Sequence, residues 1–205
     1  LDQFIDSSTM LSQNHDTFPC NFKFGVVNGL VCLVYESCLV IWNLSTRQFT
    51  RVDPPPLSGV QKSTGRIHTV VSGFGFNPIT QDYKFVTTKF RDFRTAYFEI
   101  YSMQGNSWKC FTIDFPVVLP SVHTGDGYLD GKFYWFVKTL DKSHAIMKFD
   151  FSNDTLELIP WSYGDLFGLR YFIVVTTRGR LELIATFDSG VIPQRCEVWT
   201  VGGDG

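Results

Sequence analysis

Histidines and carboxylates are the side chains of this chain that could carry acid–base or metal chemistry. None of the histidines has a second histidine or a carboxylate at a metal-ligand spacing such as HExxH; they are His15, His68, His123 and His144. The run from His123 to Asp126 fits either an acid–base pair or a simple turn, and its Thr and Gly favour the turn. No GxSxG elbow and no cysteine with the signature of a nucleophile is present. The sequence therefore predicts no catalytic residue, no metal site and no bound cofactor.

The net charge and the distribution of apolar residues argue against two classes of partner. The net charge of the 205-residue chain is −2, and no block of like charges supplies the basic footprint that nucleic-acid binding requires. No run approaches the roughly 18 consecutive apolar residues of a membrane span. We expect neither a nucleic acid nor a membrane as a partner.

The cysteines indicate the compartment. They are odd in number, show no CxxC spacing, and mostly lie in apolar runs, as small buried hydrophobic residues would; they are Cys20, Cys32, Cys38, Cys110 and Cys196. Thiols without a pairing pattern are typical of a reducing compartment, so we expect the cytoplasm, with the nucleus as the alternative.

A strand-turn-strand sequence motif recurs along the chain, and the fold that it forms must position the side chains named above. Its clearest copy runs from Ile41 to Phe49, and further copies are centred on Tyr101, Phe149 and Trp199. The copies are about 50 residues apart, which is the length of a kelch-like propeller blade of four strands. Aromatic residues make up 16% of the chain, and no segment keeps a 3.6-residue apolar period, so almost no helix is expected.

The fold predicted from these repeats is all-β, a propeller-like array of about four four-stranded antiparallel blades, with a β-sandwich as the alternative. We expect residues 1–20 to be an irregular lead-in and residues 21–205 to be one domain. The expected blades cover residues 21–53, 68–113, 121–160 and 168–205. The fourth lacks its outer strand, and the chain begins without methionine, so we expect a piece of a longer protein with an incomplete array.

Glycines and tryptophans of the repeats have structural interpretations. Gly29 and Gly131 follow Asn and Asp and fit hairpin positions that need positive φ. Gly73 and Gly75 lie within a predicted strand, where a missing side chain permits close approach or a bulge. Packing between blades is predicted for Trp42, Trp108, Trp135 and Trp199.

The repeated phrases, in their order, resemble the plant F-box-associated domain, a kelch-like family that includes S-locus F-box proteins. The matching segments are Asn28–Leu33, Ile41–Arg47, Gly73–Lys84, Glu99–Trp108, Asp130–Trp135, Phe149–Phe151 and Glu197–Trp199. Leu44 stands where the family usually has proline, and the region after Tyr163 matches loosely.

This resemblance implies a non-catalytic substrate-recognition module of an SCF-type E3 ubiquitin ligase, which binds a target protein for ubiquitination. The F-box, which docks on the Skp adaptor of the cullin ligase, would precede this segment in the family. An S-ribonuclease would be the target if the chain belongs to the self-incompatibility group. The alternative class is a propeller enzyme or carbohydrate-binding module, with Asp82, Asp126 and Asp130 gathered at a central channel.

Candidate partner-binding residues are aromatic and arginine side chains on long connections, because Tyr, Trp and Arg dominate interface energetics. These residues are Arg91, Phe93, Arg94, Trp161, Tyr163 and Phe167. A solvated hairpin tip is the alternative interpretation of residues 91–94, and rim or packing positions are the alternative for the other three.

Overall fold

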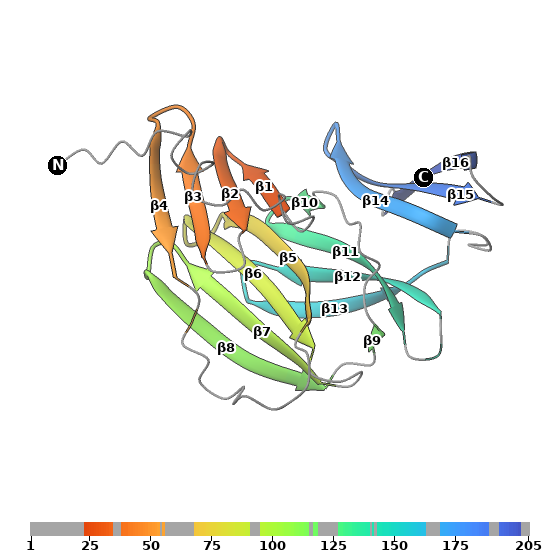
Figure 1. The fold of residues 1–205 in the computed structure, drawn as a ribbon, viewed down its shortest axis with the longest axis horizontal. Helices are drawn as coiled ribbons and strands as arrows, with labels where there is room; N and C mark the ends of the chain where they lie inside the picture. The colour runs from red at the N-terminus through yellow and green to blue at the C-terminus, as the bar shows by residue number, and fades with distance from the viewer. Residues whose placement is uncertain are drawn as a thin grey trace, which may run out of the picture.

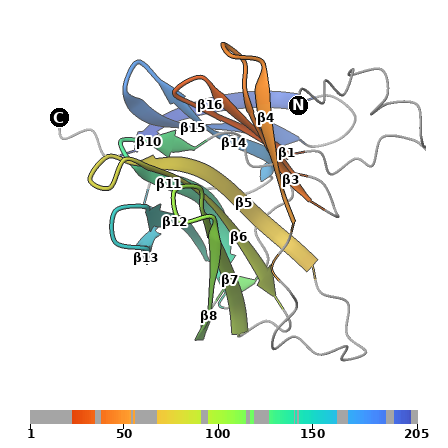
Figure 2. The same ribbon diagram turned by 90° about the vertical axis from the view of Figure 1, so that its left-hand side faces the viewer.

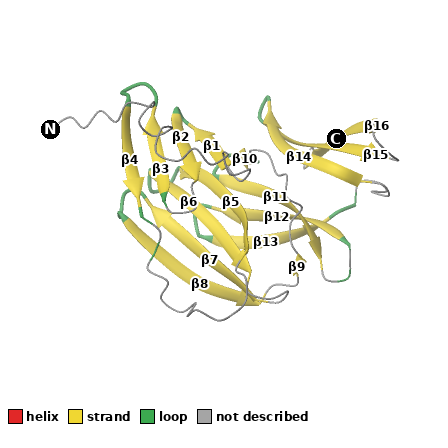
Figure 3. Ribbon diagram, in the orientation of Figure 1, coloured by secondary structure: helices red, strands yellow, loops and turns green. Residues whose placement is uncertain are grey.

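The computed structural model describes residues 23–34, 38–53, 55, 68–90, 95–114, 117–118, 127–139, 141, 143–162, 169–188 and 193–201. These residues form β-strands and short turns without a helix (Figure 3). The strands build four antiparallel sheets that follow one another along the chain.

Sheet one and sheet two have four strands each, paired in sequence order. Sheet one consists of β1 (Lys23–Val27), β2 (Leu30–Val34), β3 (Leu39–Asn43) and β4 (Gln48–Val52). Sheet two consists of β5 (His68–Asn77), β6 (Asp82–Phe90), β7 (Thr95–Ser102) and β8 (Ser107–Asp114). Each strand is joined to its hydrogen-bonded neighbour by a short connection, so each sheet is a meander.

Sheet three and sheet four vary this plan. Sheet three contains β10 (Tyr128–Leu129), β11 (Lys132–Thr139), β12 (His144–Asp150) and β13 (Thr155–Pro160), and β9 (Val117–Val118) pairs with the end of β11. The sequence did not indicate β9, because a strand of two residues is too short to show an alternating pattern. Sheet four contains β14 (Leu169–Thr177), β15 (Arg180–Asp188) and β16 (Pro193–Val201).

The four sheets radiate from a line formed by their first strands (Figure 1). β5 lies against β1 on one side and against β10 and β11 on the other, and β14 in turn lies against β10 and β11. Figure 2 shows the same array from its side, with the sheets splayed like blades. The predicted all-β, propeller-like array is confirmed, and among the described residues it does not close into a ring.

The turns follow the predicted chemistry. The first hairpin of three sheets has two central residues at positive φ: Asn28 and Gly29, Asp130 and Gly131, and Arg178 and Gly179. This is the type I′ geometry, whose twist matches that of the flanking strands. In sheets one, two and three, the turn between the third and fourth strands also ends in a residue at positive φ. These residues are Arg47, Asn106 and Asp154, respectively. We call the end of the array that carries these turns the turn end.

The opposite end carries the connections between second and third strands and those between sheets, and we call it the connection end. Trp161 and His144 mark it, since the Trp161 amide donates to the His144 carbonyl oxygen over 3.0 Å. The pairing of Lys138 with Val118 brings β9 to the same end of sheet three.

The core lies between neighbouring sheets and is built from rows of residues directly opposite one another across the strands. The row of sheet two packs on sheet one, and the row of sheet three packs on sheet two. The row of sheet four packs on sheet three. The row of sheet two consists of Phe74, Phe85, Tyr101 and Trp108. That of sheet three consists of Tyr128, Phe133, Phe149 and Leu156. That of sheet four consists of Val174, Leu183 and Trp199.

Two sequence expectations about buried residues need correction. Trp42 was expected between blades, but its side chain is 38% exposed, because it points away from sheet two. Of the cysteines, Cys32 is buried, whereas Cys110 and Cys196 are exposed and Cys38 is half-buried. Cys110 lies on β8, the outer strand of its sheet, where one face is solvated.

Candidate functional site

Asn77 joins sheet two to sheet three at the turn end. It ends β5 just before Pro78, and its side-chain oxygen accepts hydrogen bonds from the amides of Ile79 (2.9 Å) and Thr80 (3.2 Å). The side-chain nitrogen donates to the carbonyl oxygen of Phe151 over 2.9 Å, and the residue is fully buried. One side chain thus shapes the turn and satisfies a buried carbonyl group of the next sheet.

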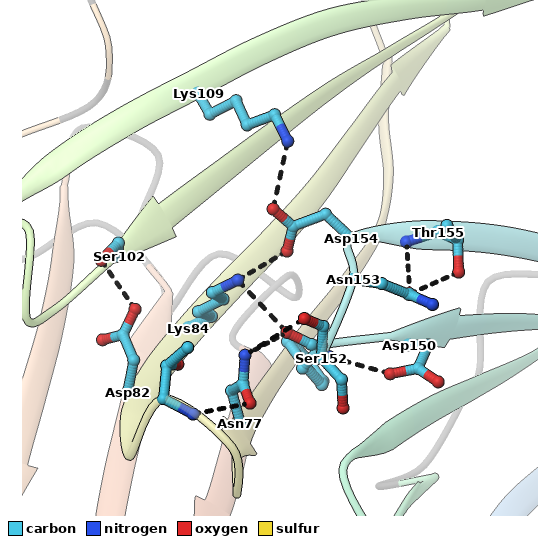
Figure 4. Close-up of polar contacts among 12 residues, drawn as sticks. Asn77, Asp82, Lys84, Ser102, Lys109, Asp150, Ser152, Asn153, Asp154 and Thr155 are labelled. Carbon is cyan, nitrogen blue, oxygen red and sulfur yellow. Dashed lines mark hydrogen bonds and ion pairs between the residues drawn. The ribbon is translucent and has the colours of Figure 1, made fainter.

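Lys84 and Asp154 form an ion pair across the same junction (Figure 4). The Nζ atom of Lys84 lies 2.6 Å from Oδ1 of Asp154, and it also donates to the carbonyl oxygen of Phe151 over 3.2 Å. The side chains of Lys84 and Asp154 are 13% and 15% exposed. Lys109 approaches the other carboxylate oxygen from solvent, at 3.2 Å. This carboxylate therefore holds two strands of sheet two against a turn of sheet three.

Asp82 is buried at the start of β6 and is used within sheet two. Its two carboxylate oxygens accept hydrogen bonds from the Ser102 hydroxyl (2.7 Å) and from the Gln104 amide (2.8 Å). The hydroxyl of the neighbouring Tyr101 donates to Asn106 over 2.9 Å. Burial, and then the charge of Asp82, raise the pKa of Tyr101. The carboxylate anchors the turn between the third and fourth strands.

The enzyme alternative drew on two other carboxylates. Asp130 is exposed in the hairpin turn after β10, at a φ of 48°. Asp126 lies outside the described residues. Within the described part of the chain, no cluster of three or more His, Cys, Asp or Glu side chains is arranged to hold a metal ion.

Two glycines of β5 make room for aromatic rings of sheet three. A Cβ atom on Gly75 would lie 2.0 Å from Cε2 of Phe151, and one on Gly73 would lie 2.8 Å from Cγ of Phe133. Next to them, Trp135 donates its Nε1 hydrogen to the carbonyl oxygen of Ser72 over 3.2 Å. The close approach predicted for these glycines is therefore one of rings to backbone.

The connection end presents a tight hairpin between β11 and β12. Asp141 accepts hydrogen bonds from the hydroxyl groups of Thr139 and Ser143 and, over 3.1 Å, from the Ser143 amide. These donors lower the pKa of the Asp141 carboxyl to about 2. The exposed tip of this hairpin thus keeps its negative charge over the physiological pH range.

A group of aromatic rings lies behind this hairpin, with Phe136 buried and His144 and Trp161 half-buried. The ring of Phe136 stacks on His144, with centroids 5.3 Å apart, and meets the edge of Trp161 at 5.4 Å. Trp161 in turn lies at 5.4 Å and 88° to Trp199 of sheet four. Burial, and then the charge of Lys138, lower the pKa of His144, so its neutral form is favoured.

Of the residues predicted to contact a partner, the structure describes Trp161. It is half-buried and packs between sheets three and four at the connection end. The others lie outside the described residues: Arg91, Phe93, Arg94, Tyr163 and Phe167. The strands that flank residues 91–94 are β6 and β7, whose facing ends belong to the connection end.

Sequence reasoning missed the polar junction of Asn77, Lys84 and Asp154, which we call the turn-end lock. Asn77 and Lys84 both lie in the segment Gly73–Lys84, one of those that carry the family resemblance, so that part of the signal was visible. Asp154 sits in a turn 70 residues further along the chain, and a turn position alone does not reveal its partner.

A repeated array of meander sheets, held together at one end and carrying its longer connections at the other, is the architecture of a β-propeller-type scaffold. The sequence model of the F-box associated beta propeller domain matches residues 2–203, and the chain belongs to this family. Its members are generally non-catalytic substrate-recognition modules of F-box proteins. A search of curated proteins finds no match. Among the described residues, no helix has the length and apolar character to cross a membrane.

Proposed function

We propose that this chain is the substrate-recognition domain of an SCF-type E3 ubiquitin ligase and binds a target protein through its connection end. The observation that carries the proposal is the difference between the two ends of the array. At the turn end, buried polar groups such as those of Asn77 and Asp82 already have partners within the domain. That end acts as a rigid base, because its polar groups are used to join sheets two and three and to fix the turns within a sheet.

The connection end has the features of a recognition surface. It combines longer connections with the charged hairpin around Asp141 and the half-buried Trp161. Loops held by a rigid scaffold are the usual place for binding residues, because they change without disturbing the core. We propose that the six predicted contact residues act here: Arg91, Phe93, Arg94, Trp161, Tyr163 and Phe167.

The partners follow from the family. Residues 21–205 act as one recognition domain, and the Skp adaptor and cullin join through an F-box outside it. The working compartment is the cytoplasm or the nucleus of a plant cell. If the domain belongs to the S-locus group, its target is an S-ribonuclease and its role lies in self-incompatibility. Nucleic acids are not targets, in keeping with the net charge of −2.

Affinity purification of the full-length protein that carries this chain, from plant tissue, tests the proposal. We expect recovery of a Skp adaptor, a cullin and at least one target protein. Replacing Arg91, Phe93 and Arg94 by alanine should abolish recovery of the target and leave the adaptor and cullin unchanged.

The matched control is Ile79→Ser, which removes a 76% exposed apolar side chain at the turn end and should leave the target bound. Loss of the target with Ile79→Ser, together with its retention by the alanine variant, would move the binding surface to the turn end. Absence of both adaptor and cullin from every preparation would contradict the ligase assignment.

A further inference from the structure

Thr88 carries a buried hydroxyl group that the fold leaves without a partner. The residue is fully buried on the face of sheet two that packs on sheet three, since it lies opposite Phe98 and two residues after Val86. Among the buried side-chain nitrogen and oxygen atoms of the described residues, only Oγ1 of Thr88 has no hydrogen-bond partner. Such a group destabilises the folded form, because its bonds to water are lost without replacement.

The neighbouring Thr87 shows the ordinary arrangement. It is 6% exposed and lies on the opposite face of the same strand. Its hydroxyl oxygen is 3.4 Å from that of Ser72, which lies directly opposite it on β5. Two adjacent threonines of similar burial therefore differ in whether their hydroxyl group is satisfied.

Thr88 also lies at an irregularity in the pairing of β5 with β6. Val71 is opposite Thr88 and Thr69 is opposite Lys89, so Val70 is an extra residue on β5. An extra residue of this kind is a β-bulge, which interrupts the ladder of hydrogen bonds and bends the strand. Beyond the bulge, towards the connection end, the pairing of the two strands continues to His68 and Phe90. The unsatisfied hydroxyl group is thus placed where the ladder is weakest.

A bulge opposite a threonine recurs in sheet four. Tyr171 is opposite Thr186 and Leu169 is opposite Phe187, so Arg170 is an extra residue on β14. This irregularity also lies at the start of the first strand of its sheet, at the connection end.

The two threonines hold the same place in their sheets. Thr88 follows Phe85 by three residues and Thr186 follows Leu183 by three residues, and Phe85 and Leu183 are the second-strand members of their buried rows. In sheet one this place belongs to Val34, and the pairing of β1 with β2 reaches Val34 without a register shift. Threonine and bulge therefore occur together, and valine occurs where the pairing is regular.

The two ends of sheet two are held against sheet three in different ways. At the turn end, Asn77 and Lys84 both donate to the carbonyl oxygen of Phe151, and Lys84 pairs with Asp154 (Figure 4). Towards the connection end, the sheet has a bulge and the unpartnered hydroxyl group of Thr88. The contacts that stabilise this junction are therefore concentrated at one end of the strands.

We propose that sheet two is a two-state element hinged at Thr88, in which residues 68–71 of β5 and 88–90 of β6 open and close locally while the turn end stays locked. The hydroxyl group sets the balance between the two states, because it has no partner in the closed state and is hydrated in the open state. Opening changes the shape of the connection end without unfolding the rest of the domain. The inference rests on the scaffold alone and is independent of the ligase function.

Hydrogen exchange of the purified 205-residue chain, followed by NMR at single amides, tests the proposal. In the wild type, protected amides of residues 88–90 should exchange faster than those of residues 83–86 on the same strand. Thr88→Val removes the hydroxyl group and keeps the branched shape, so it should slow exchange at residues 88–90 about tenfold. Unchanged exchange in this variant would mean that the strand end frays without Thr88, and would overturn the proposal.

Two matched controls are provided by the threonines themselves. Thr87→Val removes a hydroxyl group that has a partner, so it should not slow exchange at residues 88–90. Thr88→Ser keeps the unpartnered hydroxyl group and should not slow it either. Slower exchange in both controls would assign the effect to side-chain shape and would contradict the role of the hydroxyl group.

A third variant separates local opening from unfolding of the whole domain. Asp154→Asn weakens the turn-end lock, so it should speed exchange at residues 83–86. If residues 88–90 open by themselves, their exchange should stay at the wild-type rate in this variant. Equal acceleration of both groups of amides would show that they exchange by one common unfolding step, and would overturn the hinge.

Discussion

Lys84 and Asp154 connect two sheets of this domain through atoms 2.6 Å apart, at a place where both side chains are largely withdrawn from water. Lys84 comes from the second strand of sheet two and Asp154 from a turn of sheet three. The pair lies beside the buried amide of Asn77, and Asn77 and Lys84 both donate to the carbonyl oxygen of Phe151. The relative position of the two sheets is thus fixed by polar contacts as well as by apolar packing.

Removing the charge of Asp154 should destabilise the domain. Asp154→Asn keeps a residue that tolerates positive φ but leaves the Lys84 ammonium without its carboxylate, so we expect a loss of about 2–3 kcal/mol in the free energy of unfolding. Lys109→Met, at a 62% exposed partner, should cost less than about 1 kcal/mol. Urea denaturation of both variants measures the difference. Equal costs would mean that solvent replaces the carboxylate at Lys84.

Asn77→Ala should lower the free energy of unfolding by more than the loss of a side chain that only shapes a turn. Two amides lose their acceptor and the buried carbonyl group of Phe151 loses a donor, for an expected cost of about 3 kcal/mol. The control is Asn153→Ala, where an exposed side chain accepts from Thr155, and there we expect less than about 1 kcal/mol. If the two variants unfold at the same urea concentration, Asn77 has no role between the sheets.

Gly75→Ala tests the packing of sheet three on β5. The added methyl group would overlap the buried ring of Phe151, and moving that ring should cost about 3 kcal/mol. Gly29→Ala serves as comparison, because its φ of 81° is unfavourable for alanine while the space around it is open, so about 1 kcal/mol is expected. Thermal unfolding separates the two causes. A Gly75→Ala variant no less stable than Gly29→Ala would show that the junction adapts.

His144 should make stability depend on pH. Its pKa in the folded chain is below the ordinary value of 6.5, so the unfolded chain takes up the proton first as the pH falls. His144 therefore does not affect stability well above pH 6.5. Stability decreases as the pH drops through 6.5 towards the lower pKa of the folded chain. His144→Phe keeps a ring on Phe136 and removes the titration.

The measurement is the urea midpoint of wild type and His144→Phe between pH 7.5 and pH 5.5. We expect the wild type to lose more stability than the variant over this interval. Parallel curves for the two proteins would assign the pH dependence to other groups. The comparison with the variant is needed because the chain has three further histidines.

The strand pattern and the turns could be predicted from the sequence because their causes are local. Alternation of apolar residues and the Asn28–Gly29 and Asp130–Gly131 pairs set strands and type I′ turns within a few residues of themselves. The repeat length then predicted blades, and the array of sheets confirmed them. The segment Gly73–Lys84 was recognised as a motif, although its role in joining two sheets was not visible.

The contacts between sheets were decided by the tertiary structure. Trp42 and Tyr101 hold equivalent places in the repeat, yet one is exposed and the other buried, because a neighbouring sheet covers one of them. In the same way, Lys84 acquires Asp154 as its partner because packing brings together residues 70 positions apart. Local sequence sets what each sheet presents on its faces, and the packing of the sheets decides which of those faces meet another sheet and which meet solvent or a partner.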